Sequence, residues 1–550
     1  PSVSTMVDGV VMGRSGQAFM QLLDLERVEV LRGPQGTLFG KNYTAGVIHL
    51  VTKDPTEEHS GEIMGSVLSE DEYRAGLTVS GPITENLGYR LSASGDDTGG
   101  YIKNYNTGND LNGSENWNLR GKLRWMSESV ELKWASDYGK GDCDCSASPI
   151  YSLEPFGGNE DYVDSVLDLI DPVVPGDEND TVNHDKEGAF DNKQWGHSLE
   201  VNWDIGAFTL TSITALRGWE IGGKADGDID SQPIRVLGFD QGGSTEQDQY
   251  TQELRITSPA EGIINYVAGL FYFDQKVDRQ FIRSLEISPG NPGQGIADFE
   301  ALTENWAVFG EASWNISETL RLILGARYTE DDLEFTFGRV REGFPVGVPE
   351  PVPPASQSTN EEDLSGKLAL QWDYSDQGMV YLSFVQGYKG PAFDLTFGTD
   401  PVETERINPE ASESWELGIK STFLDGQLML NAALFRSVYD DFQSQAFFDP
   451  DGLPDCPADN PGCDPTDEPG GFFLINAGEV QTQGLEFDVL YQATENLPLS
   501  GGLALIAATI DTNSQGNSTH SKKCQGGCHD GRKHVYWRAM PQCTACVPHP

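Results

Sequence analysis

Two kinds of side chain in this sequence could do chemistry through their type and placement: charged residues that could pair across the fold, and cysteines. Arg32 lies at the entry to a tight turn near the N-terminus, and Glu416 and Glu486 lie on the polar faces of two later segments. A guanidinium can bind a carboxylate through two parallel hydrogen bonds, which fixes a geometry. Cys456 and Cys463 could form a disulfide within one loop. We expect no covalent catalysis, no cofactor and no bound metal.

The composition limits the elements that position these side chains. The chain has 550 residues, with 36 Lys plus Arg against 86 Asp plus Glu, so its formal net charge is −50. Nucleic acid needs basic side chains to neutralise its phosphates, so a nucleic-acid-binding function is excluded. The mean hydropathy is −0.41. No uninterrupted apolar run approaches about 18 residues, which excludes transmembrane helices but not transmembrane strands.

Most of residues 60–511 alternates between apolar and polar side chains, the pattern of strands with one apolar face. In residues 117–126 the apolar side chains share one face, and a basic row of Arg120, Lys122 and Arg124 shares the other. A lipid-facing Arg or Lys costs about 2–4 kcal/mol at mid-bilayer, so this row must face inward. There are roughly sixteen or seventeen such segments of about 10 residues, the length that a tilted strand needs to cross a bilayer.

The connections between these segments alternate between short and long. Short turns such as Ser317–Glu318 join one pair of strands, and long loops such as 332–362 join the next. This rhythm is typical of outer-membrane barrels. A soluble β-sandwich or propeller is the alternative, but it has less reason to gather its long loops at one end. A barrel with so many strands is too wide for its own side chains to fill, so we expect a plug.

The first 55 residues differ from the rest. Two short apolar strands flank a stretch rich in turn residues, which are Gly33, Pro34, Gly36, Gly40 and Gly46. Glycine at such positions permits a positive φ or a close backbone approach. A phosphate-binding loop is excluded, because Gln35 and Asn42 stand where that motif needs Gly and Ser or Thr.

The stretch LERVEVLRGPQGTLFGKNYTAGVIHLVTKDP (25–55) closely resembles the end of the plug domain of TonB-dependent outer-membrane receptors. Three later stretches, at 381–394, 408–435 and 476–491, resemble barrel strands of the same family in the same order. The resemblance covers residues 1–511.

This resemblance implies an all-β fold: a large antiparallel transmembrane β-barrel, with about 22 strands in the family, and an N-terminal plug domain inside the lumen. It divides the chain into the C-terminal part of a plug (1–55), an incomplete barrel (56–511) and an anomalous tail (512–550). The tail lacks the alternation, and a shifted reading frame or a truncated clone, with the tail disordered, explains it more simply than a zinc site does. Without the remaining strands we expect that the sheet cannot close.

The resemblance also implies a function. The chain would be part of a monomeric outer-membrane receptor of a Gram-negative bacterium that imports a scarce ligand, with a ferric siderophore or similar iron chelate as the expected one. Import would need TonB with ExbB and ExbD, acting on a segment that precedes the stretch present here. The alternatives are an oligosaccharide or cobalamin transporter, a passive porin, and a secreted all-β carbohydrate-active enzyme that uses paired carboxylates.

In the family, plug arginines pair with barrel glutamates and hold the plug in place. We therefore predict that Arg32 pairs with Glu416, Glu486 or both. The alternative is that each side chain is solvated separately in a watery lumen.

Two predictions concern the long loops. Residues 151–191 carry twelve acidic side chains against one basic side chain, which we interpret as a solvated acidic surface rather than a calcium site. Such a mouth repels anions, which slightly favours neutral or cationic ligands. Cys456 and Cys463 lie in another predicted external loop, and we expect them to form a disulfide in an oxidising compartment.

Overall fold

The computed structural model describes most of the chain between residues 2 and 511. The described ranges are 2–14, 16–19, 23–69, 71–144, 147–153, 163, 166–168, 170–184, 187–223, 238–286, 292–343, 350–394, 406–448 and 471–511. Cys456, Cys463 and the tail 512–550 therefore lie outside the described residues.

Seventeen strands of the described residues form one large antiparallel sheet, in agreement with the number of alternating segments in the sequence. They are β5 (Ser60–Val67), β6 (Glu72–Thr84), β7 (Leu87–Thr98), β10 (Ser114–Met126), β11 (Val130–Cys143), β13 (Phe190–Ile205), β14 (Phe208–Gly223), β15 (Gly238–Thr257), β16 (Ile264–Glu286), β17 (Pro292–Asn315), β18 (Leu320–Gly343), β19 (Val352–Ser375), β20 (Gly378–Lys389), β23 (Glu410–Phe423), β24 (Leu428–Asp440), β27 (Glu479–Thr494) and β28 (Leu497–Asp511).

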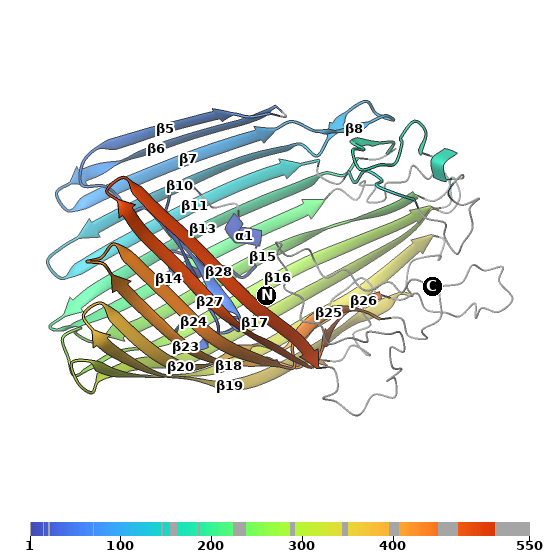
Figure 1. Cartoon of the computed structure of the whole chain (residues 1–550). Coiled ribbons are helices and arrows are strands. Elements are labelled where there is room, and N and C mark those ends of the chain that lie inside the picture. Colours follow the sequence, from blue (N-terminus) through green and yellow to red (C-terminus); the bar gives the residue numbers. More distant parts are fainter. Residues whose placement is uncertain are drawn as a thin grey trace.

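The strand order is that of a closed barrel in which β28 and β5 are neighbours. The expectation that the sheet cannot close is therefore wrong for the strand order, because strand twist and tilt carry the two end strands round to each other. This junction differs from the rest of the barrel. Residue-by-residue pairing links every other pair of neighbours, but among the described residues none links β28 to β5. In Figure 1, β28 runs diagonally across the front while β5 lies along the top.

Apolar and polar side chains alternate across the barrel wall as the sequence predicts. On β10, Trp117 and Leu119 are 42% and 50% exposed on the outer face, whereas Arg120 and Lys122 are 6% and 8% exposed. The basic row therefore faces the lumen, where it is covered by other parts of the chain. None of the helices in the described residues is long and apolar enough to cross a membrane.

The two ends of the barrel differ in their connections. At the short-turn end, tight turns join β6 to β7, β17 to β18, and β23 to β24. At the opposite, long-loop end, three small sheets are formed by β8 (Ile102–Asn104), β9 (Asp110–Leu111) and β12 (Thr181–Val182), by β21 (Ala392–Phe393) and β22 (Arg406–Ile407), and by β25 (Gln443–Phe448) and β26 (Gly471–Asn476). Figure 1 shows β8, β25 and β26 towards this end.

The N-terminal residues form a separate sheet inside the barrel, which confirms the predicted plug (Figure 1). Its strand order is β2 (Val10–Val11), β1 (Val3–Val7), β4 (Gly46–Thr52) and β3 (Leu25–Arg32), and two short helices, α1 (Gly16–Phe19) and α2 (Gly36–Phe39), belong to the same unit. β1 and β4 run parallel, and α2 packs against β17, β18, β19 and β20. The predicted domain boundary at residue 55 lies between the end of β4 and the start of β5.

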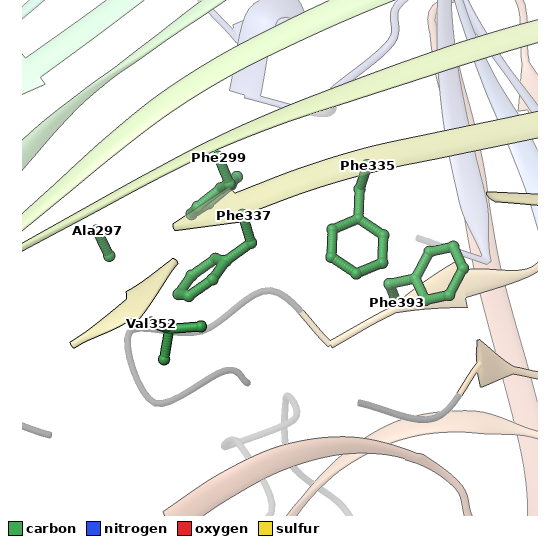
Figure 2. Packing of buried hydrophobic residues seen from close by; sticks show 6 residues of the cluster. All are labelled: Ala297, Phe299, Phe335, Phe337, Val352 and Phe393. Atoms are coloured by element: carbon green, nitrogen blue, oxygen red, sulfur yellow. The ribbon is translucent and has the colours of Figure 1, made fainter. Parts of the chain in front are cut away.

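An aromatic cluster covers part of the inner wall towards the long-loop end (Figure 2). Its buried members are Ala297, Phe299, Phe335, Phe337, Val352 and Phe393. They come from β17, β18, β19 and β21, so residues of four strands together make one apolar surface.

Candidate functional site

The interface between the plug and the barrel wall is the candidate functional site, because it holds the plug inside the barrel. Arg32, the last residue of β3, places Nη1 against Glu486 Oε2 of β27, and its Nη2 lies 3.8 Å from Asp488 Oδ2. Glu416 instead accepts a hydrogen bond of 2.5 Å from the hydroxyl of Tyr381. Of the two predicted carboxylates, Glu486 is thus the one in contact with Arg32, while Asp488 was not predicted.

The glycine-rich turn brings the plug backbone close to the barrel. Gly33 and Gly40 have φ angles of 75° and 111°, and Pro34 lines a cavity beside Arg32 and Glu416. A Cβ on Gly36 would lie 3.1 Å from the carbonyl oxygen of Gln386, and one on Gly46 would lie 2.6 Å from that of Leu31. These close approaches explain glycine at positions 36 and 46.

On another part of the wall, separated from β27 by β28, β5 and β6, Asp24 of the plug binds Arg90 of β7. The carboxylate accepts hydrogen bonds of 2.5 Å from Arg90 Nε and 2.6 Å from Arg90 Nη2, and a third of 2.6 Å from the hydroxyl of Ser92. Burial acts to raise the pKa of Asp24, but the bonds from Arg90 and Ser92 outweigh it, so that pKa is lowered from its ordinary value. The carboxylate is therefore stabilised in its charged form.

Two further plug aspartates extend this attachment to β10 and β11. Lys122 Nζ lies 3.0 Å from Asp8 Oδ2 and 3.5 Å from Asp54 Oδ1, and Lys133 Nζ lies 3.1 Å from Asp54 Oδ2. Burial acts to raise the pKa of Asp54, but the charges of Lys122 and Lys133 lower it overall. We call Asp8, Asp24 and Asp54 with Arg90, Lys122 and Lys133 the aspartate clamp.

A third group of contacts joins the glycine-rich turn to β18 and β23. Lys41 Nζ pairs with Asp331 of β18, which also accepts a hydrogen bond of 2.9 Å from Asn305. The hydroxyl of Thr44 donates a bond of 2.7 Å to Glu410, a fully buried carboxylate of β23. The plug is therefore bonded to walls on opposite sides of the lumen, as a closing element must be.

A cavity of about 170 Å³ lies between the plug and the wall around the Lys41–Asp331 pair. Residues of the plug line one side, and residues of β16, β17 and β18 line the other. Pockets that enclose a drug-sized ligand measure about 300–1,000 Å³, so this cavity can admit part of a ligand but not a whole iron chelate.

Most of the residues that attach the plug were not predicted from the sequence. The turn glycines and Arg32 were predicted, but none of the three clamp aspartates. The basic row on β10 was a usable signal, since inward-facing cations in a covered lumen need carboxylate partners. The structure also shows Cys143 in a disulfide, which was not predicted. Within the described residues, no group of three or more side chains could hold a metal ion.

Comparison with known families decides the identity of the fold. Residues 65–523 match the family described as "TonB dependent receptor-like, beta-barrel", and residues 1–47 match "TonB-dependent Receptor Plug Domain". The chain belongs to the TonB-dependent receptor family. Barrels of this family are outer-membrane transport receptors and not enzymes, so the carbohydrate-active enzyme is not favoured.

Several receptors of this family are similar to the chain. It is 25% identical over 448 residues to the pesticin receptor of Yersinia enterocolitica, and the matched region covers 80% of this chain and 60% of that protein. It is 24% identical over 511 residues to the metal-pseudopaline receptor CntO of Pseudomonas aeruginosa, covering 88% and 64%. The ferric yersiniabactin uptake receptor FyuA from Yersinia pestis superposes with a TM-score of 0.72 at 21% identity, covering 93% of this chain and 71% of that one, which shows the shared fold.

The chain spans between 60% and 64% of the length of these two curated relatives. The activity, ligand and partners of the whole protein are therefore matters of proposal.

Proposed function

We propose that this TonB-dependent receptor imports an iron chelate, such as a ferric siderophore, across the outer membrane. The observation that carries the proposal is the ion-paired plug, which lies inside the barrel and is bonded to β27, β18, β7 and β10. Such a passage transports only if the plug moves, and the sequence contains no nucleotide-binding motif that could supply the energy. TonB, with ExbB and ExbD, is the proposed external driver.

The relatives support an iron or metal chelate as the ligand. Two of their names include a metal, as receptors for metal-pseudopaline and for ferric yersiniabactin, and the third names a receptor for pesticin. We extend a ligand of this kind to the present chain in preference to an oligosaccharide or cobalamin. The outer-membrane lipid would surround the exposed apolar face, and the receptor would act as a monomer.

The Arg32–Glu486 contact is proposed to help hold the plug in its closed position. Arg32 is 61% exposed, whereas Glu486 is 17% exposed. An ion pair in so open a position contributes about 0–1 kcal/mol. It can therefore separate at little cost in free energy, and the aspartate clamp on β7, β10 and β11 is the stronger attachment.

The proposal can be tested by ligand binding to the folded chain in detergent. Trp219 is 8% exposed on the lumen side of β14, and Arg14 of the plug lies over its ring at 5.9 Å. We expect ferric chelates, but not the same chelators without iron, to change the fluorescence of this tryptophan saturably. The variant Trp219→Phe is the control, because it should remove the signal and leave binding detectable by equilibrium dialysis.

The outcome also bears on the alternatives. If neither ferric nor metal-free chelators bind while an oligosaccharide or a cobalamin does, the iron-chelate proposal is wrong. If iron uptake by cells that produce the whole receptor is unchanged when TonB is deleted, the proposed energy source is wrong.

A further inference from the structure

A basic and aromatic patch lines the lumen above the plug, and its charge contrasts with that of the whole chain. Arg279 lies on β16, 15 residues beyond Ile264 at the short-turn end. A membrane-spanning strand needs about 9–11 residues, so Arg279 stands beyond the membrane band, on the long-loop side of the plug. Arg14 lies between β2 and α1 of the plug.

The register of the strands brings the two guanidinium groups near each other: Trp219, the ring beside Arg14, pairs with Gln247 of β15, and Gln247 pairs with Val277, two residues before Arg279. Burial and the positive charge of Arg279 both lower the pKa of Arg14 from its ordinary value. Among the described residues, neither Arg14 nor Arg279 forms a salt bridge. Two like charges held together without a carboxylate partner repel each other, so an anion bound between them would relieve that repulsion.

Aromatic rings surround the same two side chains. The Arg279 guanidinium lies 5.1 Å from the ring centroid of Phe281 and 5.3 Å from that of Phe299, and Arg14 lies 5.9 Å from that of Trp219. Phe299 belongs to the apolar cluster shown in Figure 2. Aromatic rings stack on planar aromatic groups of a ligand, and the guanidinium groups beside them bind its negative charge, so both can act at the same place. We call Arg14, Arg279, Phe281, Phe299 and Trp219 the arginine–aromatic patch.

We propose that the arginine–aromatic patch binds a negatively charged iron chelate that carries aromatic rings, of the phenolate or catecholate class. This inference rests on the proposed function and names the chemical class of its ligand. It reverses the preference for neutral or cationic ligands that the acidic loop suggests. The net charge of −50 repels anions at long range, but screening by salt limits that repulsion to about 10 Å at 0.1 M. Contacts within the lumen therefore decide which ligand is retained.

The test compares two ferric complexes on the folded full chain in detergent. One is the ferric complex of a synthetic hexadentate tricatechol, which is anionic and aromatic, and the other is that of a hexadentate trihydroxamate, which is neutral and has no rings. We expect tighter binding of the tricatecholate. We also expect Arg279→Gln to weaken it by about tenfold or more, since one charge-assisted hydrogen bond contributes about 1.5–3 kcal/mol, and to leave the trihydroxamate within about twofold.

Lys276→Gln is the matched control. Lys276 lies on the same strand, three residues before Arg279, so its side chain lies on the other, outer face of the barrel wall. It pairs with Asp278 and Glu300 at 3.2 Å and 2.7 Å. The substitution Lys276→Gln removes the same charge as Arg279→Gln and should change the affinity for neither ferric complex. Arg279→Lys keeps the charge but loses the planar group, so we expect an intermediate affinity. Salt titration of the unmodified chain gives a measurement that needs no variant: tricatecholate binding should weaken with salt, and trihydroxamate binding should not.

Each result separates this inference from the proposed function. If the trihydroxamate binds at least as tightly as the tricatecholate, and neither Arg279→Gln nor salt changes tricatecholate binding, the ligand class is wrong while the uptake of iron chelates stands. If the unmodified chain binds neither ferric complex, the proposed function is contradicted and the inference fails with it.

Discussion

Asp24 of the plug and Arg90 of the barrel strand β7 form a two-bond ion pair, with N–O distances of 2.5 Å and 2.6 Å. Both side chains are almost fully covered, at 6% and 8% exposed. A covered pair of this kind fixes the position of the plug more firmly than the open Arg32–Glu486 contact can. The Arg32–Glu486 contact is thus the weaker of these two attachments, and we expect it to separate before the Asp24–Arg90 pair does.

Asp24→Asn should loosen the plug strongly, because it leaves the covered Arg90 without its counter-charge. Breaking one partner of a buried pair costs about 3–5 kcal/mol. Native-state proteolysis of the segment between β4 and β5 measures the free energy of plug opening. Glu26→Gln is the control, since the Glu26–Arg27 pair is more than half exposed and should contribute at most about 1 kcal/mol. Equal effects of the two substitutions would contradict the account.

Acid should release the plug within a defined range of pH. The pKa values of Asp24 and Asp54 are both lowered in the folded chain. A group with a lowered pKa stabilises the folded state above its unfolded pKa, about 3.9 for Asp, and loses this contribution as the pH falls through the folded pKa. We expect quenching of Trp219 fluorescence by acrylamide to stay constant from about pH 7 to pH 5 and to rise below about pH 4.

The double variant Asp24→Asn/Asp54→Asn gives the comparison for the acid experiment. It should be quenched more strongly at neutral pH and should show a smaller further change in acid. A transition of the same size in the unmodified chain and the double variant would assign the acid effect to other groups.

A double-mutant cycle should couple Arg32 to Glu486 and not to Glu416. The first pair is in contact, whereas Glu416 is bonded to Tyr381. Because Arg32 is largely exposed, the coupling energy for Arg32→Gln with Glu486→Gln should not exceed about 1 kcal/mol. The coupling for Arg32→Gln with Glu416→Gln should be near zero. A larger coupling with Glu416 would show that the closed plug uses the other predicted carboxylate.

Gly46→Ala should destabilise the plug more than Gly33→Ala does. A Cβ on Gly46 meets the carbonyl oxygen of Leu31 at 2.6 Å, whereas one on Gly33 meets nothing within 4 Å. Gly33→Ala adds only the cost of a left-handed backbone, about 1–2 kcal/mol. Gly46→Ala adds a backbone clash between β3 and β4 as well. The melting temperature of the plug transition by calorimetry tests this order, and equal melting temperatures would contradict it.

The barrel could be predicted from the sequence because its signal repeats along every strand. Trp117 faces outward and Arg120 faces inward, as the alternation of β10 requires. The position of the plug followed from the width of the barrel and from the glycine-rich stretch around Gly33 and Gly46. Closure was predicted wrongly, since the pattern of single strands contains no information on how far the twist of the whole sheet carries β28 towards β5.

The contacts that attach the plug were harder to predict because they join residues far apart in sequence. Asp24 and Arg90 are 66 residues apart, and nothing in the local pattern of either segment specifies the other. Arg32 was found through a family resemblance, which could not distinguish Glu486 from Glu416. In the structure Arg32 contacts Glu486, while Glu416 accepts a hydrogen bond from the hydroxyl of Tyr381.

Hydrogen–deuterium exchange of the amides in β4 tests the central claim, that the plug is packed inside a closed lumen and attached to its wall. β4 lies in the interior of the plug sheet, between β1 and β3. We expect its amides in the folded chain at neutral pH to exchange as slowly as those of the central barrel strand β17, and to exchange faster in Asp24→Asn. If the amides of β4 in the unmodified chain exchange at the rate of an unstructured peptide while β17 is protected, the barrel is not closed by this plug and the account is wrong.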